Sequence, residues 1–182
     1  MRKITTGLFM SLDGVVESPF EWAAPYFNEE LFEWIGAGIA AADAILLGRR
    51  TYKEFSELWP SQDSSVPMAE FLNNTPKYVV SSTLDALEWG PASLVRGDLA
   101  DEVGKLKQQP GKNIQIPGSP TLVRSLLREG LLDELNLGVA PIVVGSGMRL
   151  FDEITERVPL ELVESRALGT GLLAVNYQAA SA

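Results

Sequence analysis

The segment Ala-Ile-Leu-Leu-Gly-Arg-Arg-Thr-Tyr, residues 44–52, changes at Gly48 from an unbroken apolar run to a basic and hydroxyl-bearing run. A short run of consecutive apolar residues is typical of a strand that is buried on both faces. Apolar and aromatic residues then recur at helical spacing as far as Pro60, which a helix cannot pass. The segment therefore predicts a buried strand, a glycine turn and a helix.

The same pattern recurs along the chain. After a first strand at residues 4–11 and a helix capped by Asn28, strands are predicted at 78–80, 94–96 and 114–116, and helices near 67–73, 99–108 and 121–128. This alternation indicates an α/β fold with a mainly parallel sheet and helices on both faces. The last part of the chain has strands at 135–139, 160–163 and 172–177 with no long helix between them, which predicts an antiparallel C-terminal edge.

The composition limits the chemistry. With 182 residues, 46% of them hydrophobic, the chain has the size of one domain, and we expect residues 1–182 to form a single domain. It has no cysteine and no histidine. These absences exclude disulfides, thiolate nucleophiles, Ser-His-Asp hydrolases, His- or Cys-ligated metals and zinc deaminases. Carboxylate, hydroxyl, lysine or cofactor chemistry remains, and no metal site is predicted.

The charge limits the partners. The formal net charge is −9, and no basic run or stripe occurs. An acidic chain without a basic patch is not expected to bind nucleic acid or an anionic membrane. The N-terminal residues contain no long apolar stretch of the kind that a signal peptide or membrane span requires. We therefore expect a cytoplasmic protein with a small-molecule partner.

The junction at Gly48 has the features of a phosphate site. Glycine lets a ligand approach the backbone closely, and the N–H groups at the start of a helix attract an anion. Thr51 can cap the helix, and Arg49 and Arg50 can form charge-assisted hydrogen bonds with phosphate oxygens. The alternative interpretation is a solvated basic pair beside an ordinary helix start.

Two further strand-to-helix junctions carry small or hydroxyl residues. Ser81 and Ser82 follow the strand at 78–80, where they can hold a ribose or its 2′-phosphate, or simply form a turn with a helix cap. Residues 116–122, Ile-Pro-Gly-Ser-Pro-Thr-Leu, place Ser119 at a predicted N-cap, ahead of a proline at the first helical position. Ligands of open α/β sheets bind at the carboxyl ends of strands, so these junctions are compatible with one extended dinucleotide.

At these junctions the chain resembles the dihydrofolate reductase superfamily, and more closely the reductase domain of the riboflavin-biosynthesis deaminase-reductase and its stand-alone relatives. The markers are Ser-Leu-Asp-Gly at 11–14, Leu-Gly-Arg-Arg-Thr-Tyr at 47–52, Val-Val-Ser-Ser at 79–82, Gly-Ser at 118–119, Gly-Leu-Leu-Asp-Glu at 130–134 and Pro-Ile-Val-Val-Gly-Ser-Gly-Met-Arg-Leu-Phe at 141–151. The resemblance implies a mixed central sheet of about eight strands, NADPH as hydride donor and, often, a homodimer.

The resemblance also implies which residues bind the cofactor. The expected contacts to the pyrophosphate, the 2′-phosphate and the adenosine are Gly48, Arg49, Arg50, Thr51, Ser81 and Ser82, with Gly118, Ser119, Thr121 and Leu122 facing the phosphates from the other side. Val15 and Val16 are expected near the nicotinamide. The alternative interpretation is that both valines are ordinary residues of the hydrophobic core. In dihydrofolate reductase a carboxylate follows a Trp-x-x-Pro segment by two residues, but Phe27 occupies that place here, which argues against classical folate reduction.

We therefore expect hydride transfer to a small heterocyclic or carbonyl substrate, with a ribosylamino-pyrimidine of riboflavin biosynthesis as one candidate. The proton donor is expected among Asp13, Glu17, Glu30 and a bound water, and a carboxylic acid in this role needs a raised pKa. A phosphorylated substrate also needs a basic pocket, for which the candidates are Lys77, Arg96, Arg124 and Arg149. The alternatives are a pterin or dihydrofolate reductase, a dinucleotide-binding dimeric module without turnover, and a purely structural protein.

Overall fold

The computed structural model describes residues 1–66 and 68–180, and its strands form two sheets. The first is entirely parallel and consists, in spatial order, of β1 (Ile4–Thr6), β6 (Asn113–Ile116), β3 (Ala42–Gly48), β4 (Lys77–Val80) and β5 (Ala92–Val95). The second consists of β2 (Leu8–Ser11), β7 (Leu135–Ala140), β9 (Leu173–Ala179) and β8 (Leu160–Ala167). In this sheet β2 is parallel to β7, whereas β9 is antiparallel to both of its neighbours.

The two sheets meet at Gly7. This residue separates β1, which pairs with β6, from β2, which pairs with β7. The Gly7 N–H still donates to the carbonyl of Ile116, while the Thr6 N–H donates to the carbonyl of Glu134. The one strand predicted at residues 4–11 is therefore two short strands, and the chain changes sheets between them. With this division the described residues form nine strands, close to the eight expected, and the predicted α/β fold is confirmed.

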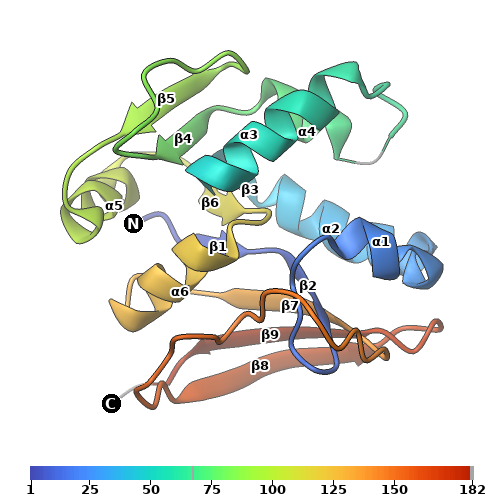
Figure 1. Ribbon diagram of the computed structural model, residues 1–182. Coiled ribbons are helices and arrows are strands. Elements are labelled where there is room, and N and C mark those ends of the chain that lie inside the picture. The colour runs from blue at the N-terminus through green and yellow to red at the C-terminus, as the bar shows by residue number, and fades with distance from the viewer. Residues whose placement is uncertain (67, 181–182) are drawn as a thin grey trace.

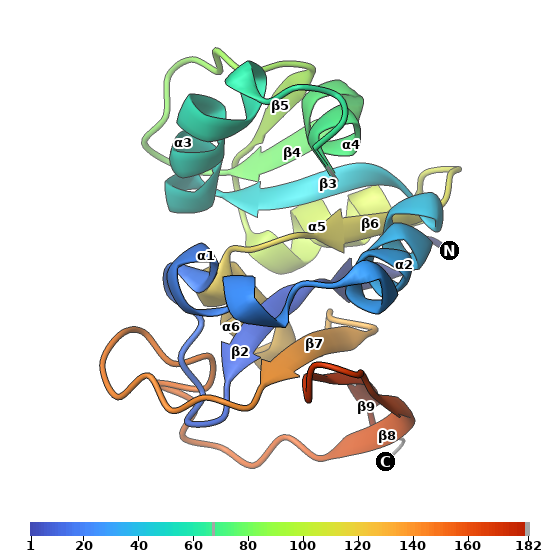
Figure 2. The same ribbon diagram turned by 90° about the vertical axis from the view of Figure 1, so that its right-hand side faces the viewer.

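Helices cover both faces of the parallel sheet, as predicted (Figures 1 and 2). On one face lie α1 (Pro19–Trp22), α2 (Glu29–Ala40), α3 (Arg49–Leu58) and α4 (Ala69–Asn74), with the short 3-10 helices η1 (Ala24–Tyr26) and η2 (Trp59–Ser61). On the other lie α5 (Leu99–Gln108) and α6 (Pro120–Arg128). The predicted helix near 67–73 is α4, and residue 67 itself lies outside the described residues.

The hydrophobic core has two main parts, one on each face of the parallel sheet, because side chains along a strand point alternately to the two faces. Ile114 and Ile116 of β6 pack in the cluster that includes α5 and α6, whereas Ile45 and Leu47 of β3 pack with α3 and α4. Burying a large aliphatic side chain contributes about 1.5–3 kcal/mol. Because neighbouring residues of a strand point to opposite faces, the packing of Ile114 and Ile116 turns Gln115 toward the face that carries α2 and α3.

Local structure confirms some predicted boundaries and corrects others. Asn28 is the N-cap of α2, where its side chain accepts from the Leu31 N–H at 3.0 Å. Residues 169–171, Gly-Thr-Gly, lie in the turn between β8 and β9. The helix predicted to open at Thr51 begins at Arg49, with Gly48 as its N-cap, so Thr51 lies in the first helical turn and does not cap it.

Within the described part of the chain, no helix combines the length and the apolar character that crossing a membrane requires. The same residues contain no group of three or more Asp and Glu side chains arranged to hold a metal ion.

Candidate functional site

A cleft of about 890 Å³ opens where the two sheets diverge, between α2 and α3. Its floor is formed by the end of β1, by Gly7 and by β6, and one wall by the β3–α3 junction. Nine of the residues predicted to bind a cofactor line it: Val16, Gly48, Arg49, Arg50, Thr51, Gly118, Ser119, Thr121 and Leu122. The structure therefore brings together junctions that lie about seventy residues apart in the sequence.

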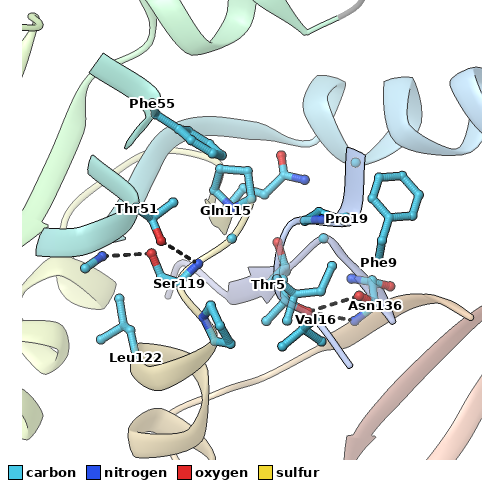
Figure 3. A pocket seen from close by; sticks show the side chains of 18 of the residues that line it. Thr5, Phe9, Val16, Pro19, Thr51, Phe55, Gln115, Ser119, Leu122 and Asn136 are labelled. Atoms are coloured by element: carbon cyan, nitrogen blue, oxygen red, sulfur yellow. Dashed lines mark hydrogen bonds between the residues drawn. The ribbon is translucent and has the colours of Figure 1, made fainter. Parts of the chain in front are cut away.

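Two hydrogen bonds hold the β3–α3 junction against the β6–α6 junction (Figure 3). The Gly48 N–H donates to Ser119 Oγ at 2.9 Å, and the Ser119 N–H donates to Thr51 Oγ1 at 3.1 Å. Ser119 adopts a left-handed backbone with φ of 57°, and its side chain makes no capping hydrogen bond in α6. The helix starts of α3 and α6 are thus fixed side by side at one wall of the cleft.

Gly118 is required by close packing at this junction. A Cβ atom on Gly118 would lie 2.9 Å from Thr51 Cγ2 and 3.6 Å from Phe55 Cζ. The Thr51 side chain cannot easily move away, because it is buried and its hydroxyl accepts from Ser119. The glycine therefore permits an approach of α3 to the β6–α6 turn that no larger residue allows.

The two arginines of the junction have different environments. Arg50 is paired with Glu54 at 2.8 Å and with Glu17 at 3.1 Å, and these hydrogen bonds raise the pKa of its guanidinium further. Arg49 is exposed and donates to Thr83 Oγ1 at 3.1 Å, and among the described residues no carboxylate lies within ion-pair distance of it. Arg49 is therefore the better placed of the two to meet an added anion.

Ser81 and Ser82 do not line the cleft. Ser81 Oγ accepts from the N–H groups of Thr83 and Leu84 at 3.2 and 3.0 Å. These hydrogen bonds form a turn, which was the alternative to ribose binding at this junction. The segment still adjoins the cleft, because Thr83 binds the guanidinium of Arg49.

Asp13 and Glu30, the predicted proton donors, also lie outside the cleft lining. Asp13 accepts from Ser11 Oγ at 2.7 Å and from the N–H groups of Val144 and Gly145, and these bonds lower its pKa to about 2. The pKa of Glu30 is also lowered, chiefly because its carboxylate accepts from the Gly169 N–H at 2.7 Å. Both shifts run opposite to what a proton donor at neutral pH needs, so the structure does not support this role for either residue.

Sequence analysis missed the polar floor of the cleft. Gln115, Thr5 and Asn136 line it, under walls that include Phe9, Pro19 and Phe55 (Figure 3). A signal for Gln115 was present, because Asn-Ile-Gln-Ile at 113–116 alternates polar and apolar residues and so predicts one polar face. For Thr5 and Asn136 we find no comparable signal, since their position in the cleft depends on how β1 and β7 pair with other strands.

The RibD C-terminal domain family matches residues 2–174 of the chain. The chain belongs to this family. The uncharacterized protein YyaP of Bacillus subtilis (strain 168) is 27% identical over 182 residues, which cover 97% of this chain and 94% of YyaP. The RibD C-terminal domain thus accounts for nearly the whole length of the chain, and the predicted family is confirmed.

Solved structures agree on the fold of this RibD C-terminal domain. A putative riboflavin biosynthesis protein from Shewanella sp. PV-4 superposes with a TM-score of 0.79 at 21% identity, with full coverage of both chains. A dihydrofolate reductase from Enterococcus faecalis, in complex with NADP(H) and RAB-propyl, gives a TM-score of 0.61 at 16% identity, covering 97% of this chain and 94% of the reductase. The chain therefore has a dihydrofolate-reductase-like fold, shared with this member of the superfamily and with the Shewanella protein.

Proposed function

We propose that the chain is an NADPH-dependent reductase that transfers a hydride to a small heterocycle bound in the cleft between α2 and α3. The observation that carries this proposal is the pair of hydrogen bonds by which Ser119 joins Gly48 and Thr51 at one wall of the cleft. They align the starts of two helices, α3 and α6, at the carboxyl ends of β3 and β6. Backbone N–H groups at helix starts attract anions, so this wall suits a pyrophosphate.

The residues present fit a dinucleotide. Gly118 keeps the wall free of a Cβ atom, and Arg49 stands beside the turn at Ser81 and Ser82, where a 2′-phosphate can accept its hydrogen bonds. Val16 is nearly buried and lines the cleft, where it can pack against the nicotinamide. When bound, NADPH would supply the hydride, and the protein would supply position and exclusion of water.

The protein's own part in the reaction is orientation and protection from solvent. Phe9, Pro19 and Phe55 form apolar walls on either side of the polar floor. Glu17 lines the cleft, but its pKa is lowered by the Met148 N–H and by Arg50, which keeps it ionised. We therefore assign proton delivery to a water molecule admitted to the cleft rather than to a carboxylic acid.

Titration with NADPH and with NADH, followed by tryptophan fluorescence and melting temperature, tests the cofactor assignment. NADPH should bind more tightly, and Arg49→Ala should reduce that preference about tenfold or more, because it removes a charge-assisted hydrogen bond. Arg128→Ala is the matched control, since Arg128 is exposed at the far end of α6 and does not line the cleft. Equal affinity of the wild type for both dinucleotides would contradict the role of Arg49.

A second candidate is a dinucleotide-binding module without turnover. It is favoured by the positions of Asp13 and Glu30, neither of which lines the cleft. Sustained NADPH oxidation with an amino-substituted pyrimidine or a dihydropterin would exclude it. Tight NADPH binding with no oxidation across both substrate classes would support it instead.

The chain is also proposed to form a homodimer through β8. This edge strand exposes most of its side chains, including Leu162 at 50% and Val163 at 54%. Exposed apolar residues on an unpaired edge favour association with another chain. Light scattering should give the mass of two chains for the wild type and of one chain for Leu162→Glu, and a monomeric wild type would contradict this assignment.

A further inference from the structure

A row of polar side chains crosses the floor of the cleft on five neighbouring strands. The row consists of Gln115 on β6, Thr5 on β1, Asn136 on β7, Asn176 on β9 and Glu164 on β8, and all five residues line the cleft. Strand pairing aligns them within each sheet, because Thr5 is in register with Gln115, and Asn176 is in register with both Asn136 and Glu164. Where the two sheets meet, Thr5 forms a bridge with Glu134, two residues before Asn136. The floor is thus a continuous polar surface rather than the apolar layer that usually lies under a helix.

Two acceptors of this floor have no partner. Gln115 is only 6% exposed, and its Oε1 accepts no hydrogen bond from a described residue. The same holds for the buried Oδ1 of Asn176. In the close view the amide end of Gln115 reaches toward the space bordered by Phe55 and Phe9 (Figure 3). A buried polar group without a partner is costly, so each such group in a native protein needs an explanation.

The helix above this floor leaves room for a ligand. Toward its C-terminal end α2 lines the cleft with the small residues Ala37 and Gly38 and with its C-cap Ala41, whereas Trp34 and Ile35 line the cleft one turn earlier. The amide nitrogen of Gln115 lies between two glycines, since a Cβ atom would be 3.1 Å from it on Gly7 and 3.4 Å on Gly38. The two glycines place only backbone beside the amide of Gln115, so its side chain lines the cleft although only 6% of it is exposed.

The charge of the floor is unsuited to a phosphate. Glu134 and Glu164 line it, and the arginines that line the cleft, Arg49 and Arg50, belong to the proposed cofactor wall. The four basic candidates for a substrate phosphate are engaged elsewhere. Lys77 is buried against Trp89, Arg96 donates to the Leu84 carbonyl, Arg124 donates to the carbonyls of Arg149 and Asp152, and Arg149 donates to those of Asp13 and Gly145.

We propose that the substrate is an uncharged, unphosphorylated heterocycle rich in N–H donors, and that Gln115 and Asn176 accept hydrogen bonds from it. This inference rests on the proposed function and adds the chemical class of the substrate. Because an amide can turn about its last bond, the Gln115 oxygen can face a donor in the cleft. A ligand without donors would leave both oxygens unpaired, and a site built for N–H groups discriminates strongly against such a ligand.

A matched pair of bases tests the donor requirement on the wild-type protein with NADP⁺ bound, by calorimetry. 5,6-Diaminouracil retains both ring N–H groups, and 5,6-diamino-1,3-dimethyluracil has neither. We expect the dimethyl compound to bind about tenfold or more weakly. Equal affinity for the two bases would overturn the inference, as would a failure of 5,6-diaminouracil to bind while NADP⁺ binds.

Substitution of Gln115 tests the assigned acceptor. Gln115→Met keeps the length of the side chain and removes the amide, so it should lower the affinity for 5,6-diaminouracil about tenfold and largely abolish discrimination against the dimethyl compound. NADP⁺ affinity should be unchanged. Gln108→Met, on the exposed end of α5, is the control and should change neither. Wild-type affinity of Gln115→Met for 5,6-diaminouracil would overturn the role of Gln115. If this variant does not fold, the comparison of the two uracils on the wild-type protein still tests the donor requirement.

Comparison of a nucleoside with its 5′-phosphate tests whether the floor binds a phosphate group. Uridine and uridine 5′-phosphate should bind with similar affinity in the presence of NADP⁺, because the described residues that line the floor include no lysine or arginine to pair with the phosphate. A tenfold gain from the phosphate group would overturn this part of the inference. Failure of NADP⁺ itself to bind would instead refute the proposed function, so the two failures are distinguishable.

Discussion

Replacing Gly118 with alanine should destabilise the fold and disturb the proposed cofactor wall, because the added methyl group would collide with the side chain of Thr51. The new Cβ atom would lie 2.9 Å from Thr51 Cγ2. Carbon atoms pack at about 3.5–4.0 Å, so one of the two segments has to move by more than half an ångström. Backbone strain makes no contribution, because Gly118 is not among the glycines with positive φ.

The expected cost is that of overpacking a buried site, about 1–3 kcal/mol of unfolding free energy. For a chain of this length, each kcal/mol lowers the melting temperature by about 2–4 °C. NADPH affinity should fall as well, because moving Thr51 disturbs the hydrogen bond that fixes Ser119 at the wall. Thermal denaturation and fluorescence titration measure the two effects separately.

A second substitution makes the test specific. Thr51→Ser removes the Cγ2 atom and keeps the hydroxyl that accepts from Ser119, so the double variant Gly118→Ala/Thr51→Ser should recover most of the lost stability. Gly104→Ala in the middle of α5, where a Cβ atom would meet nothing within 4 Å, is the control and should stabilise the protein by about 0.5–1 kcal/mol. Strictly additive effects of the two substitutions would refute the proposed contact.

Three further predictions concern groups around the site. Ser119→Ala should be about 1 kcal/mol less stable than Ser119→Gly in thermal denaturation, because both lose the acceptor for Gly48 but only glycine adopts a φ of 57° without strain; equal stability would refute strain at this residue. Burial lowers the pKa of Lys77 to about 8 from 10.5, so the unfolded chain binds more protons between these values and unfolding free energy rises with pH across that window. Lys77→Met should lack this rise in chemical denaturation, and a pH dependence matching the wild type would contradict it. The pKa of Asp13 is lowered to about 2 from 3.8, so its contribution to stability is present above pH 3.8 and is lost as the pH falls through about 2. Asp13→Asn should remove this acid dependence and leave NADPH affinity intact, whereas a loss of NADPH binding would show that Asp13 serves the cleft.

Local sequence patterns were sufficient to predict most of the elements and the strand-to-helix junctions that form the proposed cofactor wall. The apolar run before Gly48 and the alternation at 114–116 predict strands because burial and side-chain direction follow from the next few residues alone. The cap at Asn28 is read in the same way. Glycine and hydroxyl residues at strand ends then indicate a ligand edge, since parallel strands of one sheet place their carboxyl ends together.

The proton donors could not be judged from the sequence. Asp13 and Glu30 are acidic residues near a predicted site. The pKa of Asp13 is lowered first by the neighbouring Ser11 hydroxyl, but the further N–H donors to the two carboxylates, from Val144, Gly145 and Gly169, lie more than a hundred residues away. The difference between Arg49 and Arg50 could not be judged from the sequence either. Glu17, one of the two carboxylates that pair with Arg50, lies just before α1 and more than thirty residues before Arg50. Such contacts exist only after the strands have paired.

The sequence by itself therefore determined the main strands and helices in their order, the acidic character of the chain, and the junctions that are proposed to bind a dinucleotide. Tertiary structure decided where the sheet divides at Gly7 and which polar residues meet beneath α2. Gln115 and Asn176 are sixty-one residues apart, and they share one cleft because β1 and β7 lie between their strands. Side-chain direction is a local property of a strand, whereas the neighbours of a strand are fixed only by the packing of the whole sheet.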